Sequence, residues 1–165
     1  MINLDQVGKG HPAEKPFIQA VYNYTLLLDA KTVFEIGSGH FTFSHAILAA
    51  LEKTGGHLCT CDPKPQIEYS HPQMHLFKQT SDQMLPVCQQ HFDLLMIDGD
   101  HSYTQVKKDF TNFYPHVRTG GLIIFHDINV PSAPGVKKLW TELKPNHKIE
   151  AELLTWPGLG VIQKQ

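Results

Sequence analysis

The chain lacks several features that would place it in common classes of protein. Its 165 residues include 14 Lys and Arg against 16 Asp and Glu, so there is no basic excess for binding nucleic acid or an anionic membrane surface. No apolar run approaches the roughly 20 residues that span a bilayer, and the opening MINLD lacks the basic and apolar blocks of a signal peptide. We therefore expect a cytoplasmic protein that binds a small molecule, and neither nucleic acid nor membrane.

Cysteine is also scarce. The three cysteines, Cys59, Cys61 and Cys88, are an odd number without a CxxC pair, and the first two lie on one predicted strand, poorly placed to bridge each other. We interpret all three as reduced, buried thiols, and a metal site of the CxC pair with His57 is the alternative. The 11 histidines are scattered instead of clustered at ligand spacing, which favours surface or capping roles for most of them.

The size of the chain favours one domain. With 41% hydrophobic residues it has enough apolar side chains for one core, but it is too short for two ordinary domains. We expect a single domain over residues 1–165, with an N-terminal arm and helix in residues 1–30 and the core in residues 31–165. Helical spacing of apolar residues predicts that this helix covers residues 17–28, where it could also cap a ligand site.

Strand and helix patterns alternate along the rest of the chain. Apolar and β-branched runs predict strands at residues 32–36, 57–61, 74–78, 92–97, 122–125, 149–155 and 160–163. The predicted order is a βα unit repeated five times, followed by two strands joined by a short loop. Because a short loop joins only antiparallel strands, this order predicts an α/β fold. It is Rossmann-like and doubly wound, with a mostly parallel seven-stranded sheet and one antiparallel strand near the C-terminus.

The helix after residue 97 has a clear start signal. Ser102 and Gln105 have the spacing of a capping box, in which each side chain bonds to the backbone N–H of the other residue. The apolar face of this helix is predicted to reach Val117. Gly120 and Gly121 are predicted to end the unit before the next strand.

Ionisable residues follow two of the predicted strands. Asp98 and Asp100 come directly after strand 92–97, and His126 and Asp127 follow the strand that ends at residue 125. The carboxyl ends of parallel strands share one edge of the sheet, and open α/β sheets bind ligands there. An acid that ends an apolar strand must face water, a partner or a metal. Asp98 is therefore the strongest single candidate for a functional residue.

Three segments form a specific combination. They are FEIGSG at residues 34–39, IDGDHSY at residues 97–103 and GGLIIFHD at residues 120–127. In this order they resemble the class I S-adenosylmethionine-dependent methyltransferases, specifically the small-molecule O-methyltransferase branch. The resemblance extends from about Thr32 to the end of the chain. It implies S-adenosylmethionine as cofactor and a hydroxyl of a small molecule as methyl acceptor.

The resemblance also implies positions for the cofactor. The glycine turn, with Glu35 below it, would hold the methionine part, and Asp98 would meet the methionine amine. Asp62 closes strand 57–61, where a carboxylate can accept hydrogen bonds from both ribose hydroxyls, and the residues after the third strand would hold adenine. The predicted cofactor-binding residues are Glu35, Gly37, Ser38, Gly39, Asp62, Ser81, Asp82, Asp98 and His101. The alternatives are structural: a tight strand-to-helix turn, a turn residue before Pro63, and a helix start at residues 81–82.

The residues around Asp98 fit three interpretations. Asp98 and Asp127, with His126 or His101, could hold a divalent metal, either Mg²⁺ through carboxylates or Mn²⁺ or Zn²⁺ through imidazole. Without a metal, His101 or His126 could take the proton of the acceptor hydroxyl. His101, His126 and Asp98 are therefore the candidate catalytic residues. In a third interpretation both histidines are strand-end residues bonded to loop carbonyls.

Two departures from the family pattern keep other functions open. Phe41 stands where a third glycine would complete GxGxG, and an aromatic side chain there could narrow the pocket. The segment before the first strand is also short for covering a substrate. The main alternative is thus a catalytically inactive cofactor-binding or regulatory domain, although a second subunit of a homodimer could also close the site. A nicotinamide oxidoreductase is disfavoured because Thr42 replaces the last glycine of GxGxxG.

Overall fold

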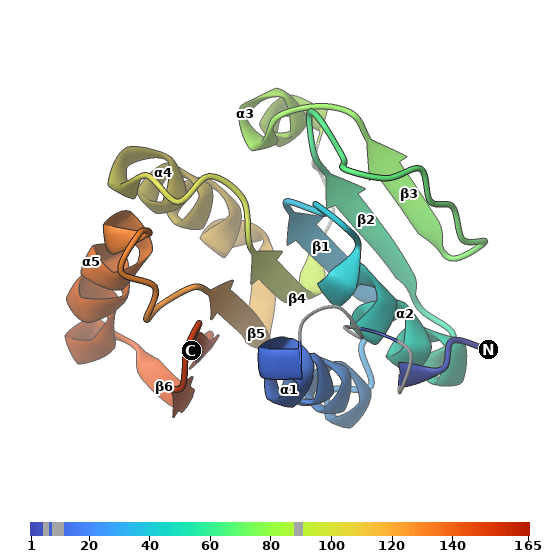
Figure 1. The fold of residues 1–165 in the computed structure, drawn as a ribbon, viewed down its shortest axis with the longest axis horizontal. Coiled ribbons are helices and arrows are strands. Elements are labelled where there is room, and N and C mark those ends of the chain that lie inside the picture. The colour runs from blue at the N-terminus through green and yellow to red at the C-terminus, as the bar shows by residue number, and fades with distance from the viewer. Residues whose placement is uncertain (5–6, 8–11, 88–90) are drawn as a thin grey trace.

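The computed structural model describes residues 1–4, 7, 12–87 and 91–165. It contains a seven-stranded sheet in the order β3-β2-β1-β4-β5-β7-β6, with helices on both faces (Figure 1). The predicted fold class is confirmed, because β7 runs antiparallel to both of its neighbours while the other paired strands are parallel. The strands are β1 (Thr32–Ile36), β2 (His57–Cys61), β3 (Met74–Phe77), β4 (Phe92–Ile97), β5 (Val117–His126), β6 (Lys148–Leu153) and β7 (Leu159–Gln163).

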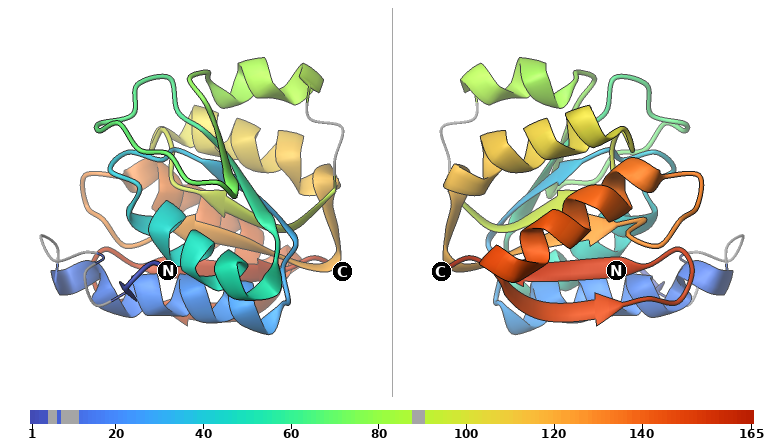
Figure 2. Two further views of the ribbon diagram at one scale, coloured as in Figure 1. Left: turned by 90° about the vertical axis from the view of Figure 1, so that its right-hand side faces the viewer. Right: turned by 90° about the vertical axis from the view of Figure 1, so that its left-hand side faces the viewer.

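The helices form two layers, one on each face of the sheet (Figure 2). On one face lie α1 (Lys15–Leu27) and α2 (Thr42–Thr54), and on the other lie α3 (Ser81–Met84), α4 (Tyr103–Phe113) and α5 (Pro134–Leu143). Short 3-10 turns cover Pro12–Glu14, Leu85–Val87, Tyr114–His116 and Lys144–Asn146. Within the part of the chain that the structure describes, no helix combines the length and apolar character needed to cross a membrane.

The central strands are apolar on both sides because both sides face helices. Along β4, Leu94 and Met96 pack in the cluster under α1 and α2, whereas Leu95 and Ile97 pack in the cluster under α4 and α5. Successive side chains of a strand point to opposite faces, so a strand buried on both faces reads as an unbroken apolar run. This burial holds β1, β4 and β5 side by side, and their carboxyl ends meet at one edge.

One predicted helix is absent, and the βα unit occurs four times instead of five. No helix joins β2 to β3; the chain returns through an irregular loop at residues 62–73. Prolines at 63, 65 and 72 supply no backbone N–H for a helix there. The loop is held by other bonds, since the side-chain amide of Gln73 donates to the carbonyls of Leu51 and Gly56 at 2.9 and 2.7 Å.

The start of β5 was also predicted wrongly. Helix α4 ends at Phe113, Val117 already belongs to β5, and Gly120 and Gly121 lie inside this strand instead of before it. Gly120 has a φ of +77°, and the pairing of β4 with β5 shifts register between Phe92 and Leu94, as at a β-bulge. A Cβ on Gly121 would lie 2.8 Å from the carbonyl oxygen of Asp93. Both glycines therefore serve a bulged strand, not a helix end.

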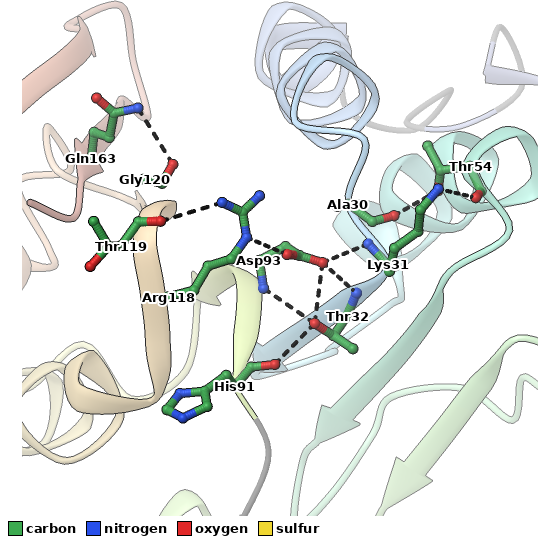
Figure 3. A network of polar contacts seen from close by, with 10 residues as sticks. All are labelled: Ala30, Lys31, Thr32, Thr54, His91, Asp93, Arg118, Thr119, Gly120 and Gln163. Carbon is green, nitrogen blue, oxygen red and sulfur yellow. Dashed lines mark hydrogen bonds and ion pairs between the residues drawn. The ribbon is translucent and has the colours of Figure 1, made fainter.

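A polar network closes the opposite edge of the sheet, where the strands begin (Figure 3). Asp93 Oδ2 accepts hydrogen bonds from the backbone N–H groups of Lys31 and Thr32 at 2.6 and 2.8 Å, and Oδ1 pairs with Arg118 Nε at 2.5 Å. These bonds tie the starts of β1, β4 and β5 together. Asp93 is thus the second residue of β4 and Asp98 directly follows the strand, so only Asp98 lies at the ligand-binding edge.

The cysteines match their predicted state in part. Cys59 and Cys61 are free thiols, but only Cys61 is buried and Cys59 is half-buried; Cys88 lies outside the described residues. Burial raises the pKa of Cys61 to about 12, and nearby carboxylates add to this effect. Among the described residues, the side chains grouped closely enough to hold a metal ion are Asp98, His101 and Asp127, which disfavours the alternative of a CxC metal site with His57.

Candidate functional site

The glycine turn packs directly on the end of β4. The backbone N–H of Gly37 donates to the carbonyl oxygen of Cys61 at 2.8 Å, and the backbone N–H of Asp98 donates to the carbonyl oxygen of Ile36 at 2.9 Å. Gly37 has a φ of +88°, and a Cβ at this position would lie 2.2 Å from the carbonyl oxygen of Asp98. Only a glycine allows this contact. The turn and Asp98 are therefore brought together by backbone packing.

Asp62 holds the glycine turn from the end of β2. Its Oδ2 accepts hydrogen bonds from the backbone N–H groups of Ser38 and Gly39 at 3.1 and 2.9 Å, and its Oδ1 accepts from the N–H of Lys64 at 2.7 Å. The carboxylate lines a cleft, as a ribose-binding acid would, and it also has the turn-forming role that was the alternative interpretation. Ser38 Oγ also lies 3.4 Å from Oδ2. Oδ1 accepts one hydrogen bond here and can accept another from a ribose hydroxyl, so the two roles are compatible.

Phe41 lies away from the clefts. It has the left-handed conformation expected of the missing glycine, with a φ of 60°, and it precedes the first residue of α2. Its side chain is fully buried in the core under α1 and α2, where its ring packs against that of Tyr69 with the two ring centroids 5.2 Å apart. It does not belong to the lining of the cleft on either side of the turn. An aromatic residue at this position thus leaves the space for a ligand unchanged.

A first cleft of about 450 Å³ opens between the glycine turn and the α3–α4 side of the sheet edge. It brings together six of the predicted cofactor residues: Gly37, Gly39, Asp62, Ser81, Asp82 and Asp98. The lining residues that were not predicted as part of a site include two polar residues of α4, Gln105 and Asp109. Asp109 could have been noticed in the sequence, because it falls three residues after Val106 on the otherwise apolar face of the helix.

The capping box predicted for α4 is only half formed. The Ser102 side chain accepts from the backbone N–H of Gln105 at 3.3 Å, but the N–H of Ser102 is bonded to Asp100 Oδ1 at 2.7 Å. The side chain of Gln105 turns inward instead, toward Ser81 and Asp109. Burial raises the pKa of Asp109, and the hydrogen bonds from Ser81 and Gln105 oppose that rise.

A second cleft of about 420 Å³ lies on the other side of the glycine turn. It shares Gly37, Gly39, Asp98 and Gly99 with the first cleft, so the two spaces meet at the turn and at the end of β4. Its lining also contains the remaining predicted site residues: Glu35, Ser38, His101, His126 and Asp127. The turn and the acids at 98 and 127 thus converge on one cleft.

Two carboxylates and two imidazoles form a connected cluster in the second cleft. His126 Nδ1 lies 3.1 Å from Asp98 Oδ1 and 3.3 Å from Asp127 Oδ1, and His101 Nε2 lies 2.9 Å from Asp127 Oδ2. The predicted alternative in which both histidines bond to loop carbonyls does not match this arrangement. His126 is nearly buried, and its Nε2 has no hydrogen-bond partner among the described residues.

The cluster shifts the pKa values of its own members. Burial acts to lower the pKa of His126, but the charges of Asp98 and Asp127 outweigh this and raise it to about 10. The hydrogen bond to Asp127 raises the pKa of His101. Burial acts to raise the pKa of Asp127, but the two imidazoles hold it below the usual range. The cluster therefore favours an anionic Asp127 beside an imidazolium at His126.

A divalent cation fits part of this cluster. Asp98, His101 and Asp127 each offer one ligand atom, and these atoms lie within 4.8 Å of one another. Two carboxylates and one imidazole suit Mn²⁺, and Mg²⁺ can complete such a set with water. Of the two histidines predicted as possible ligands, His101 belongs to this group, whereas His126 pairs with both carboxylates through Nδ1.

Glu35 lies beneath the turn and is buried to 1% exposure. Burial raises the pKa of Glu35 from 4.5 to about 7, a rise that the 2.5 Å hydrogen bond from Ser44 opposes and the charge of Asp98 increases. Between these two values an unfolded chain releases the Glu35 proton while the folded chain retains it. The folded state is therefore destabilised progressively as the pH rises through this window.

We expect Glu35→Gln to remove this pH dependence. The amide oxygen can still accept from Ser44, and the side chain has no proton to release. Relative to that of the unchanged protein, the free energy of unfolding of the variant should increase by about 2 kcal/mol between about pH 5 and about pH 8. Urea unfolding of both proteins across this range measures the difference. Parallel curves would contradict the buried, proton-holding state of Glu35.

The comparison with known families agrees with this arrangement. The sequence profile of the family described as "Methyltransferase domain" matches residues 34–128. The chain belongs to this methyltransferase family. The matched segment of the methyltransferase domain begins in β1 and extends just past β5, so it contains the glycine turn, Asp62, Asp98, His101 and Asp127.

Solved structures share the fold of this methyltransferase domain at low sequence identity. A presumed caffeoyl-CoA O-methyltransferase from Staphylococcus aureus matches at 16% identity and a TM-score of 0.74, over 91% of this chain and 83% of the other. The O-methyltransferase TomG from Streptomyces achromogenes, in complex with SAM, matches at 14% identity and a TM-score of 0.71, over 98% of this chain and 89% of TomG. The N-methyltransferase NodS from Bradyrhizobium japonicum, in complex with SAH, matches at 14% identity and a TM-score of 0.72, over 95% of this chain and 90% of NodS.

Two curated relatives match the methyltransferase domain over shorter segments. An uncharacterized protein of Sinorhizobium fredii is 42% identical over 52 residues, which are 31% of this chain and 6% of that protein. An uncharacterized protein of Acanthamoeba polyphaga mimivirus is 51% identical over 35 residues, which are 21% of this chain and 16% of that protein. The matched segments thus span only a small part of either relative.

Proposed function

We propose that the chain is an S-adenosylmethionine-dependent methyltransferase that transfers a methyl group to a hydroxyl of a small molecule. The observation that carries this proposal is the meeting of two clefts at the turn of Gly37 and the end of β4, where Asp98 lies in both. The first cleft suits an adenosyl group, and the second suits the methionine part and the acceptor. The sulfonium supplies an electrophilic methyl group where they meet.

The first cleft offers the polar groups that an adenosyl ligand needs. Asp62 Oδ1 has acceptor capacity left for a ribose hydroxyl, and Ser81 and Asp82 lie beyond it on the side that would take the base. Gly37 and Gly39 let the ligand approach the backbone closely. Asp98 lies where the ammonium group of the methionine part can pair with a carboxylate.

The second cleft supplies groups for activating the acceptor. Transfer forms an O–CH₃ bond, breaks the S–CH₃ bond with its electron pair going to sulfur, and releases the hydroxyl proton. In its neutral form His101, whose Nε2–H pairs with Asp127, can accept this proton at Nδ1, and its side chain is 43% exposed, so the proton can pass on to water. A divalent cation held by Asp98, His101 and Asp127 would instead lower the pKa of the acceptor hydroxyl.

Binding and turnover test the proposal in two steps. Calorimetry with S-adenosylmethionine and S-adenosylhomocysteine should show binding to one site, and Asp62→Ala should weaken it. Methyl-labelled S-adenosylmethionine is then incubated with a panel of phenols, catechols, sugars and amines, with and without EDTA. Absence of binding would overturn the proposal. Binding without turnover of any acceptor would favour the inactive cofactor-binding domain, and methylation of amines alone would overturn the choice of a hydroxyl.

EDTA separates the two routes for activating the hydroxyl. Loss of turnover with EDTA, restored by Mn²⁺ or Mg²⁺, assigns activation to a cation held by Asp98, His101 and Asp127. Turnover that EDTA leaves unchanged assigns it to the Asp127–His101 pair.

A further inference from the structure

The α3–α4 corner of the first cleft is organised around a buried acid. Asp109 is 1% exposed, and its Oδ1 accepts from Ser81 Oγ at 2.6 Å and from Gln105 Nε2 at 2.9 Å. Among the described residues, no cationic side chain lies within ion-pair distance of it. A buried carboxylate without a cation depends on donated hydrogen bonds, and these orient the donors.

The polar hydrogens of the Ser81 and Gln105 side chains all point to oxygen atoms of this corner. Ser81 has one hydroxyl hydrogen, which it donates to Asp109. Gln105 Nε2 has two hydrogens, and it donates to Asp109 and, at 3.2 Å, to Ser81 Oγ. The Gln105 amide cannot be reversed, because its oxygen would then face the Asp109 carboxylate, which only accepts. The group of Gln105 that remains for a ligand is its carbonyl oxygen, Oε1.

The neighbouring carboxylate is already paired. Asp82 Oδ2 lies 2.6 Å from Lys108 Nζ, so this ion pair occupies the outer rim of the same corner. Asp62, the candidate for the ribose, lines the β2 side of the cleft. A base attached to a ribose at Asp62 would therefore extend toward Ser81 and Gln105, where Gln105 Oε1 can accept a hydrogen bond from it.

We infer that Gln105 is the residue that selects adenine, by accepting a hydrogen bond from its 6-amino group through Oε1. Asp109 is a positioning residue, because it fixes the direction of the Gln105 amide through Nε2. Hypoxanthine carries a carbonyl oxygen in place of the amino group, so it would oppose one acceptor with another. The inference rests on the proposed function, since it requires an adenosyl ligand in the first cleft.

Binding of two matched ligands tests this inference. Calorimetry compares S-adenosylhomocysteine with its hypoxanthine analogue, S-inosylhomocysteine. The unchanged protein should prefer the adenosyl ligand at least about tenfold, since an acceptor that loses its donor inside a binding site is costly. Gln105→Ala should reduce the preference to about threefold or less. Asp109→Asn should also reduce it, because an amide at 109 lets the Gln105 amide rotate. Thr104→Ala, at an exposed position of the same helix, should keep it.

The outcomes separate this inference from the proposed function. If the unchanged protein binds neither ligand, the proposed function fails. If it binds S-adenosylhomocysteine and Gln105→Ala keeps the full preference, the assignment of Gln105 is overturned while the methyltransferase proposal stands. Gln105 is only half-buried, so its variant remains a decisive test even if Asp109→Asn does not fold. A melting curve of each variant confirms that the compared proteins are folded.

Discussion

Gly37→Ala is expected to destabilise the protein by about 4 kcal/mol and to abolish cofactor binding. The new Cβ would lie 2.2 Å from the carbonyl oxygen of Asp98 and 2.8 Å from the Cα of Gly99, and both are backbone atoms. The left-handed φ of +88° adds strain for any side chain. Relief requires the ends of β1 and β4 to separate, which would pull the two clefts apart. Urea unfolding and calorimetry with S-adenosylhomocysteine measure both effects.

Gly39 provides the matched control in the same turn. Its φ is also positive, at +46°, but a Cβ there would have no heavy atom within 4 Å. Gly39→Ala keeps the backbone N–H that donates to Asp62, so its cost should be limited to about 1 kcal/mol of conformational strain. Equal losses of stability in the two alanine variants would show that the contact between the turn and β4 is not what makes Gly37 necessary.

Asp98→Asn is expected to lower kcat/KM by about a hundredfold or more once an acceptor is known. The amide has nearly the same shape as the carboxylate but lacks its charge. It would weaken the pairing with His126 Nδ1 at 3.1 Å, the proposed contact with the methionine ammonium, and the proposed cation site. Initial rates of methyl transfer, at saturating and limiting S-adenosylmethionine, measure the loss. A variant with full turnover would remove Asp98 from the mechanism.

Asp93→Asn is the control for this experiment, because it changes an acid at the other end of the same strand. Asp93 is bonded to Lys31, Thr32 and Arg118, and it has no part in either cleft (Figure 3). Its replacement should reduce stability while the turnover of the folded protein stays unchanged. If both variants lose turnover alike, the loss in Asp98→Asn reflects damage to β4 instead of chemistry.

Parts of the fold could be read from local sequence because local signals decide them. The strands 32–36, 57–61 and 92–97 were predicted with the bounds they have in the structure. Each is a short apolar or β-branched run that ends at a residue unsuited to continue it, such as Gly37 or the pair Asp62 and Pro63. The glycine turn and the acid after β4 could be placed at one edge for the same reason, since parallel strands all end there.

Other parts depend on contacts between segments far apart in the sequence. Gly120 and Gly121 resemble a helix end, but the close approach of Asp93 to Gly121 places them inside β5. Gln105 has two possible roles, and the buried carboxylate of Asp109 competes for its side chain with the exposed N–H of Ser102. The buried bond wins because water cannot replace it. Sequence spacing shows only the local partner.

The bonds from Asp62 to the glycine turn have a consequence for the speed and cost of ligand capture. The N–H groups of Ser38 and Gly39 are already held in place by this carboxylate before any nucleoside arrives. Fixing the backbone of a free residue costs about 1–2 kcal/mol in conformational entropy. In this turn that entropy is lost when the chain folds, not when the ligand binds. The turn is preorganised, so an incoming ligand finds a rigid receptor and need not wait for a loop to assemble around it.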